Sequence, residues 1–474
     1  MKITLILLLM IWGGLVSCSS PSKPGHTRKD INKFSTHELN SLRRGIAVMK
    51  ERSKKDPSDP RGWIYQAAIH GTYAIPGQDD WNQCKHGHSR FFLSWHRMYL
   101  YYFERILREA SGDPSLTLPY WNYAKEANRS IPMAFLQPPT AENSLYEPIR
   151  LDSANAGGIF ITGAYKATDA MTALNFDDVN DGLDGFSSLL ADVPHRDVHG
   201  AVGGLMADPI NAALDPLFFL HHANIDRLWE GWLLLRNERH NPTDDDWLRN
   251  HKFNFYDENK KAVILSGQEI LDTAKQLNYR YDDYTTTPEP IELTQRVELQ
   301  PLQVGQQEKL IAAYDYQEKP FFLGQRQTKV DLSLESTAKQ KLRSLIRVPG
   351  SRNIDAKSLS GKIKLILGDL KADAPIEGYF EVYIDLPIDL EETKINPDRP
   401  EFVGLLSFFD VWGHHDTLSK HTIRVDLSHF DFLSARGDSF TIMFLRRGME
   451  VPGHKEPPHF NGNPSIGSIK LTLK

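Results

Sequence analysis

The chain has few cysteines, since its 474 residues include only Cys18 and Cys84. So low a content excludes a fold held together by several disulfide bonds. Positive charge is not in excess either, because the formal net charge is −6, and this balance gives no electrostatic reason to bind nucleic acid. The length exceeds the roughly 100–200 residues of one ordinary domain, so we expect at least two domains.

Long apolar runs are also absent, except for residues 3–16. This run is shorter than the ~20 residues of a membrane-spanning helix and has the size of a signal-peptide core. It ends in Leu15-Val16-Ser17-Cys18, which resembles a bacterial lipobox. We therefore predict a lipoprotein signal over residues 1–18, lipidation of Cys18 and a tether over residues 19–34. The predicted location is the outer membrane or cell surface, reached by export; a secreted or periplasmic protein is the alternative.

Hydrophobic periodicity divides the rest of the chain into two kinds of structure. Apolar residues spaced by three and four predict a helix over 36–52. Asp59-Pro60 supplies a cap and a helix-start proline for a second helix over 61–73, and further helices are expected over 92–110, 194–202 and 216–236. Later segments alternate apolar and polar residues, which predicts strands over 362–367, 379–384, 402–408, 422–427 and 440–444. We therefore expect a multidomain protein with a mainly α-helical domain over 35–285, a linker over 286–327 and an all-β, sandwich-like domain over 328–474.

Histidines gather in two segments, one with His70, His86, His88 and His96, and one with His195, His199, His221 and His222. Because His195 and His199 are four residues apart, their imidazoles project from one face of a helix and can chelate one ion. Imidazole suits zinc, copper, iron and nickel, but three neutral imidazoles per ion favour copper that cycles between Cu(I) and Cu(II). The sequence has no His-Glu-x-x-His, which weighs against a zinc hydrolase of that type.

The segments around these histidines carry longer patterns. His86, followed by Phe92-Leu93-Ser94-Trp95-His96-Arg97 and Glu104, resembles the copper A signature of tyrosinases. Asp215-Pro216-Leu217-Phe218-Phe219-Leu220-His221-His222, followed by Asp226, resembles the copper B signature. On these motifs the chain is similar, over about residues 35–285, to the type-3 dicopper family of tyrosinases and polyphenol oxidases. Residues 253–258 and 380–384 add a resemblance to the plant-type members.

The resemblance implies two copper ions (Cu²⁺) as cofactors, O₂ as co-substrate and a four-helix-bundle core around the metals. It implies His70, His86 and His96 as copper A ligands and His195, His199 and His222 as copper B ligands. His88 stays open as the alternative to His86, although the family spacing to Phe92 fits His86. The position of Cys84, two residues before His86, implies a thioether bond between them; a free buried cysteine is the alternative.

Further side chains are expected near the metals without binding them. His221 is expected to orient a neighbour, and Arg196 is a candidate to attract an anionic phenol. The remaining members of this group are Phe218, Phe219 and Asp226. They are expected to line the site, to control access to it or to pack in the core.

The implied activity is the oxidation of o-diphenols (catechols) to o-quinones with reduction of O₂ to water. Tyrosinases often carry Asn where this chain has Arg196, and plant-like relatives often carry Glu where it has Ala191. Asp192 or Asp184 would have to replace that Glu. We therefore favour a catechol oxidase. The alternatives are a tyrosinase with full monophenolase activity and a haemocyanin-like O₂-binding protein.

The expected partner is a small phenolic substrate. A membrane is expected to be contacted only through the N-terminal lipid. No nucleic acid is expected as a partner, and the oligomeric state is not predicted. In relatives the C-terminal domain can cover the active site and keep the enzyme latent. The same shielding is a hypothesis for this chain.

Overall fold

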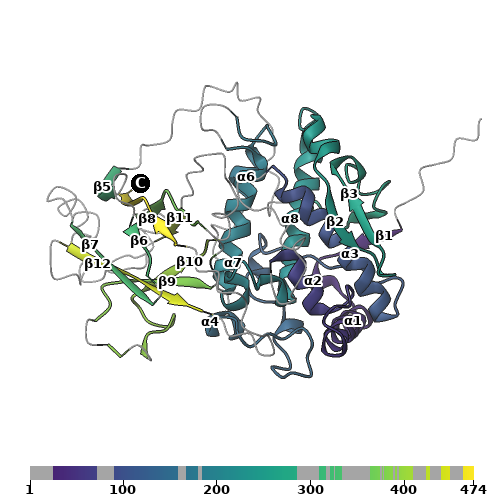
Figure 1. The fold of residues 1–474 in the computed structure, drawn as a ribbon, viewed down its shortest axis with the longest axis horizontal. Helices are drawn as coiled ribbons and strands as arrows, with labels where there is room; N and C mark the ends of the chain where they lie inside the picture. Colours follow the sequence, from purple (N-terminus) through teal and green to yellow (C-terminus); the bar gives the residue numbers. More distant parts are fainter. Residues whose placement is uncertain are drawn as a thin grey trace, which may run out of the picture.

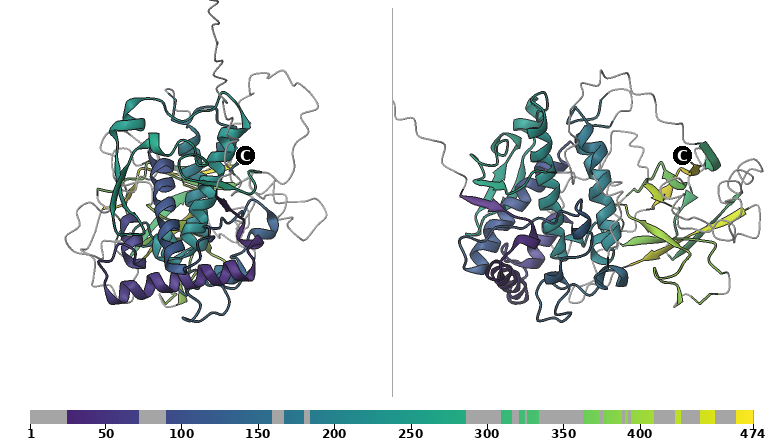
Figure 2. Two further views of the ribbon diagram at one scale, coloured as in Figure 1. Left: turned by 90° about the vertical axis from the view of Figure 1, so that its right-hand side faces the viewer. Right: turned by 180° about the vertical axis from the view of Figure 1, so that it is seen from behind.

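The computed structural model describes most of the chain, with gaps. The described residues are 25–71, 90–158, 167–179, 184–285, 309–315, 321–324, 326–333, 363–373, 376, 378–387, 390–391, 394–408, 423–426, 439–448 and 463–473. A helical part lies beside a part built of strands, as Figures 1 and 2 show. Within the described ranges, no helix combines the length and hydrophobicity needed to cross a membrane.

Helices dominate the described residues up to 285. They are α1 (Thr36–Lys55), α2 (Trp63–His70), α3 (Phe92–Ser111), α4 (Asp152–Asn155), α5 (Thr168–Thr172), α6 (Phe186–Leu190), α7 (Asp197–Val202) and α8 (Leu217–Leu235). Two short strand pairs lie beside them. The parallel pair is β1 (His26–Arg28) with β4 (Tyr279–Tyr281), and the antiparallel pair is β2 (Phe253–Tyr256) with β3 (Ala262–Leu265).

Local sequence explains where several helices begin and end. Ser35 and Glu38 form a capping box at the start of α1, each side chain accepting from the other's backbone N–H. Gly112 ends α3 in a left-handed conformation with φ of 66°. The helix expected over 194–202 is confirmed, since the non-helical angles of Val193 (φ −133°, ψ 116°) separate residue 194 from the preceding turn, and the helical residues 194–196 lead directly into α7.

Helices α3 and α8 pack together at the centre of the helical part. Phe103 of α3 stacks on Phe219 of α8, with ring centroids 3.5 Å apart. Trp63 of α2 meets both rings edge-on, at 6.0 and 5.5 Å. Aromatic pairs contribute about 0.5–1.5 kcal/mol each beyond the area that they bury. They fix the relative positions of three helices that carry histidines of the predicted metal site.

The strands after residue 308 form two four-stranded sheets. The first has the order β10 (Phe402–Leu406), β9 (Tyr379–Ile384), β12 (Ser439–Arg447), β7 (Gln327–Ser333). The second has the order β11 (Ile423–Asp426), β8 (Ile363–Gly368), β14 (Ser468–Leu473), β5 (Lys309–Asp315). A further pair is β6 (Phe321–Phe322) with β13 (Ser465–Ile466). Phe380 of the first sheet and Leu471 of the second belong to one buried cluster, so the sheets share a core.

Two segments that the sequence analysis assigned to a tether and a linker contain regular structure. The expected tether 19–34 includes β1, in which Arg28 is fully buried. The expected linker 286–327 includes β5, which pairs with β14. Both expectations were wrong for these residues. The strand partners lie far along the chain, so local composition gave no signal.

The strand part packs against the helical part through α7. Helix α7 contacts β10, and Figure 1 shows the two elements next to each other. The first C-terminal sheet therefore lies against the short helix that carries His199.

Candidate metal centre

Five histidines from different elements of the helical part come together. His70 ends α2, His96 lies on α3, His199 on α7 and His222 on α8. His195 lies in a π-helical turn, Ala191–Arg196, that leads into α7. None of the five is more than 2% exposed. The structure thus brings together the described members of both expected ligand groups.

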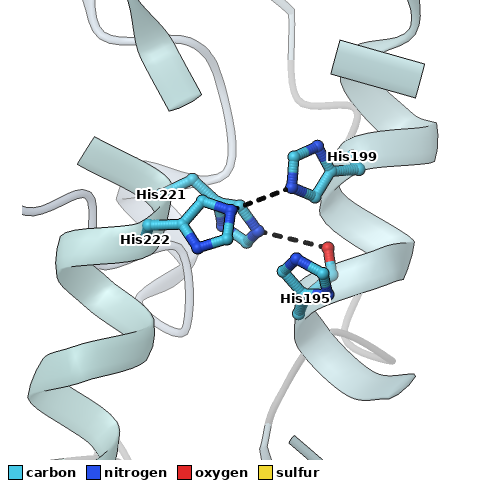
Figure 3. A group of neighbouring side chains, drawn as sticks. All are labelled: His195, His199, His221 and His222. Carbon is cyan, nitrogen blue, oxygen red and sulfur yellow. Dashed lines mark hydrogen bonds between the residues drawn. The ribbon is translucent and has the colours of Figure 1, made fainter. Parts of the chain in front are cut away.

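The imidazole rings face one another across the two groups. His96 and His222 stack with centroids 4.2 Å apart, and His70 lies 5.7 Å from His96. The Nε2 atoms of His199 and His222 are 3.2 Å apart (Figure 3). Nitrogens that face each other at this distance can bind one ion together. Four of the histidines form a compact group: His195, His199, His221 and His222. One ring nitrogen from each lies within 4.8 Å of those of the other three.

Backbone carbonyls fix the orientation of three rings. The Nδ1 atom of His96 lies 2.8 Å from the main-chain oxygen of Phe92. The corresponding distances are 3.0 Å from His195 to Ala191 and 2.7 Å from His199 to Met206. Because a carbonyl oxygen only accepts, each Nδ1 carries the proton and donates it. Each Nε2 then keeps its lone pair for a metal ion, as in other oriented histidine ligands.

The donor set fits copper. Burial lowers the pKa of His96 and that of His199, each to about 3, because the charged ring is poorly solvated inside the protein. These rings are therefore neutral at pH 7. Among the described residues, the histidine group contains no carboxylate. Neutral imidazoles without carboxylates suit an ion that alternates between Cu(I) and Cu(II).

His221 belongs to the same group but is held differently. Its Nδ1 atom lies 3.1 Å from the Tyr123 hydroxyl. Its Nε2 atom lies 3.2 Å from the His195 carbonyl oxygen, as Figure 3 shows. Both nitrogens face protein groups, so neither is left for a metal ion. This placement favours His222 as the ligand of the pair.

The residues expected to decide between phenol substrates lie around His195. Arg196 Nη1 is 2.8 Å from Asp192 Oδ1, one helical turn earlier. Ala191 is fully buried and offers only a methyl group and its carbonyl. Asp184 is exposed. The Asp192 carboxylate is therefore engaged by Arg196.

The two phenylalanines of the copper B motif have different surroundings. The Phe218 ring lies 4.1 Å from that of His222 and 4.7 Å from that of His70. Phe219 instead stacks on Phe103 in the core. Phe218 therefore packs against the histidines, whereas Phe219 holds α8 to α3.

Asp226 lies in a buried ionic cluster. Its carboxylate contacts four buried side chains, those of Arg28, Arg97, Tyr279 and Tyr281. The Arg97 Nε to Asp226 Oδ1 distance is 2.6 Å. Arg97 directly follows His96, and Asp226 lies one turn after His222. The cluster therefore ties the two central histidine-bearing helices together, and Asp226 faces this cluster.

Several expected site residues lie outside the described residues: Cys18, Cys84, His86 and His88. Their roles as lipidation site, thioether partner and alternative copper A ligands stay predictions.

The structure also shows supporting residues that the sequence analysis missed. Arg150 pairs with Asp215 of the copper B motif, and Tyr123 bonds to His221. These partners are 65 and 98 residues apart in the sequence. Asp215 could have been recognised from the sequence, because an Asp in front of a helix often caps it. No sequence pattern pointed to Arg150 as its buried partner.

Comparisons with known proteins agree with this geometry. Residues 60–153 and 159–235 match the family model described as the common central domain of tyrosinase, and residues 241–289 match that of the polyphenol oxidase middle domain. The chain is 33% identical over 304 residues to a tyrosinase from Hahella sp. (strain CCB-MM4), covering 54% of this chain and 63% of the relative.

A second relative is the latent form of a chloroplastic polyphenol oxidase from Prunus armeniaca, 30% identical over 308 residues, covering 55% of this chain and 49% of the relative. The chain therefore matches less than two thirds of the length of either protein. Among solved structures, latent apple tyrosinase is similar in fold, with a TM-score of 0.51 at 23% identity, covering 96% of this chain and 98% of that chain.

Proposed function

Because the chain belongs to the tyrosinase and polyphenol oxidase family, whose cofactor is a pair of copper ions, we propose that it oxidises catechols to o-quinones with O₂. The observation that carries this proposal is a buried group of imidazoles, three of which are held through Nδ1 by backbone carbonyls, with no carboxylate among its described members. The oxidation is balanced when two catechols give four electrons and four protons, and one O₂ becomes two waters.

We propose His70, His86 and His96 as the ligands of copper A, and His195, His199 and His222 as those of copper B. Support comes from the carbonyl-anchored Nδ1 atoms of His96, His195 and His199, which leave the ring lone pair on Nε2. The thioether between Cys84 and His86 belongs to the same proposal. The copper pair, when bound, supplies O₂ binding and takes up the electrons of the substrate.

The protein contributes orientation and the exclusion of water. Phe218 packs on His70 and His222, and so shields one side of the rings. The backbone carbonyls hold the ring protons on Nδ1 throughout. A substrate phenol therefore meets a site in which the ligands need no rearrangement.

We favour catechol oxidation over monophenol hydroxylation for a specific reason. The Asp192 carboxylate is paired with Arg196, and Ala191 has no polar side chain. Asp184 is exposed. None of these positions offers an unengaged carboxylate beside His195 to deprotonate a phenol, so hydroxylation should be slow.

The remaining architecture and location are proposals of the same kind. We propose a four-helix-bundle core formed by the long helices, and a sandwich-like C-terminal domain that begins at β5 rather than at residue 328. Export, with lipid attached to Cys18, is proposed from the apolar run and the lipobox-like residues at 15–18.

The test is a substrate panel on the copper-loaded full chain. O₂ uptake and quinone absorbance are measured with 4-methylcatechol and with tyramine. We expect rapid turnover of the catechol and little hydroxylation of tyramine. Fast tyramine hydroxylation would replace the proposal with a tyrosinase. Reversible O₂ binding without catechol turnover would indicate a haemocyanin-like carrier, and a preparation that retains zinc but not copper would refute the copper oxidase altogether.

A further inference from the structure

His221 connects the two elements that carry the proposed copper B ligands. It lies on α8 beside His222, is fully buried, and its Nε2 reaches the main-chain oxygen of His195 at 3.2 Å. The rings of His221 and His195 lie nearly parallel, with 10° between their planes and centroids 5.7 Å apart. A single imidazole therefore bridges α8 and the turn that leads into α7.

The two partners of His221 determine which nitrogen carries its proton. The His195 carbonyl oxygen can only accept, so the Nε2 atom of His221 must donate. In the neutral ring, Nδ1 then has a lone pair and can only accept. The partner of Nδ1 is the Tyr123 hydroxyl at 3.1 Å, so Tyr123 donates to His221. The chain of donors runs from Tyr123 through His221 to the backbone of His195.

Tyr123 is itself fixed against α8. It is 1% exposed, and its ring lies 5.3 Å from that of Trp121 in an edge-to-face arrangement. The backbone N–H of Trp121 donates to the Leu220 carbonyl oxygen at 3.3 Å. The indole N–H of Trp121 donates to the Asn128 carbonyl oxygen at 2.8 Å. The hydroxyl of Tyr123 therefore has a defined position next to His221.

The backbone around His195 needs such support because it is irregular. The π-helical turn Ala191–Arg196 contains Val193 with non-helical angles, so regular helical hydrogen bonding is interrupted before His195. The bond from His221 reaches the backbone of His195 from a different helix. It places the His195 ring relative to His222, whose centroid lies 5.0 Å away.

We propose that Tyr123 is a positioning residue for copper B. By donating to Nδ1 it keeps the His221 proton on Nε2, and His221 then holds the backbone of His195 so that its ring and those of His199 and His222 converge on one ion. This role rests on the proposed ligand set. His221 is a structural link in it and does not bind the metal.

The experiment compares Tyr123→Phe with Tyr120→Phe in the full chain. Tyr120 is a matched control, because it is a buried tyrosine three residues away whose hydroxyl donates to Asp282 at 2.6 Å. Copper content and dissociation constants are measured by competition with a chelator. The Cu(II) EPR signal reports coupling, since two coupled Cu(II) ions give little signal and an isolated one gives a full signal. Thermal unfolding is followed in parallel.

We expect Tyr123→Phe to weaken binding of one of the two copper ions by about 10–100-fold, the usual effect of removing a partner behind a metal ligand. An uncoupled Cu(II) EPR signal should appear. Tyr120→Phe should lower thermal stability to a similar extent without changing copper affinity or the EPR spectrum.

A second pair of variants separates positioning from metal binding by His221. His221→Gln retains a terminal N–H that can reach the His195 carbonyl, so it should preserve more of the copper affinity than His221→Leu. Equal loss in both variants would overturn the bridging role. Wild-type copper affinity and EPR silence in Tyr123→Phe would overturn the role of Tyr123. A wild-type chain that binds no copper would instead refute the proposed function, and the inference with it.

Discussion

Arg150 and Asp215 form a fully buried, two-pronged ion pair at the start of α8. Nε and Nη2 of Arg150 each lie 2.7 Å from a different oxygen of Asp215, and neither side chain is exposed. Asp215 Oδ1 also accepts from the backbone N–H of Leu217 at 2.8 Å, which caps the helix. The pair therefore anchors the helix end from which His222 is positioned.

Removal of one partner should be costly because the other charge would remain buried without compensation. We expect Arg150→Ala to lower the free energy of unfolding by about 3–5 kcal/mol, as measured by urea denaturation. The matched control is Arg249→Ala, because Arg249 pairs with Asp245 at the surface and such pairs contribute about 0–1 kcal/mol. Similar losses in both variants would show that the buried pair has no special role in anchoring α8.

Substitution of a proposed copper B ligand should abolish turnover without unfolding the chain. We expect His199→Ala to retain one copper ion instead of two and to lose catechol oxidation, because the Nε2 atom that faces His222 would be missing. His240→Ala is the control, since His240 is exposed. Metal analysis and O₂ uptake provide the readouts. Two tightly bound copper ions and full activity in His199→Ala would refute the ligand assignment.

The ion pair between Arg196 and Asp192 should limit the attraction of anionic substrates. Asp192→Asn removes the negative charge that contacts the Arg196 guanidinium, so we expect the kcat/KM ratio of a carboxylated catechol to a neutral one to rise by about tenfold at low ionic strength. The rise should shrink in salt. Arg196→Gln should abolish any preference. If the ratio is unchanged in Asp192→Asn, Arg196 does not act on the substrate.

Glu147 should make stability depend on pH. Burial, and then the nearby Asp215, raise the pKa of Glu147 from its ordinary value of 4.5 to about 7. Since the folded-state pKa is raised, the stabilising contribution is complete below about pH 4.5 and is lost as the pH rises through 7. We expect Glu147→Gln to be more stable than the wild type at pH 8, by up to about 2–3 kcal/mol, with the difference vanishing towards pH 4.

The comparison uses urea denaturation at several pH values, with Glu142→Gln as control because Glu142 is exposed. A stability difference for Glu147→Gln that is constant between pH 4 and pH 8 would show that the Glu147 carboxyl does not titrate in this range.

The sequence predicted the helices because their signals are local. Ser35, Glu38 and Gly112 mark helix ends through contacts within a few residues. The strand Tyr379–Ile384 was also predicted with its observed bounds, since its flanks contain turn residues. By contrast, β1 and β5 could not be predicted, because each is a strand only through a partner more than a hundred residues away.

The same limit applies to the metal centre. His96, His195, His199 and His222 stand in recognisable spacings, and the structure brings them together with His70. The groups that orient these rings are backbone carbonyls and distant side chains such as Tyr123. A backbone carbonyl carries no residue-specific signal, so sequence motifs point to the proposed ligands and not to the groups that hold them.

The contact between α7 and β10 bears on whether the C-terminal sheets restrict access to the histidines. Because α7 carries His199, a sheet packed against it should hinder the approach of a phenol to the histidines. We expect cleavage at a protease site inserted between residues 286 and 308, ahead of β5, to raise kcat/KM for catechols. The control is the uninserted chain treated with the same protease. Full separation of the sheets with unchanged turnover would mean that they stabilise α7 without shielding the site.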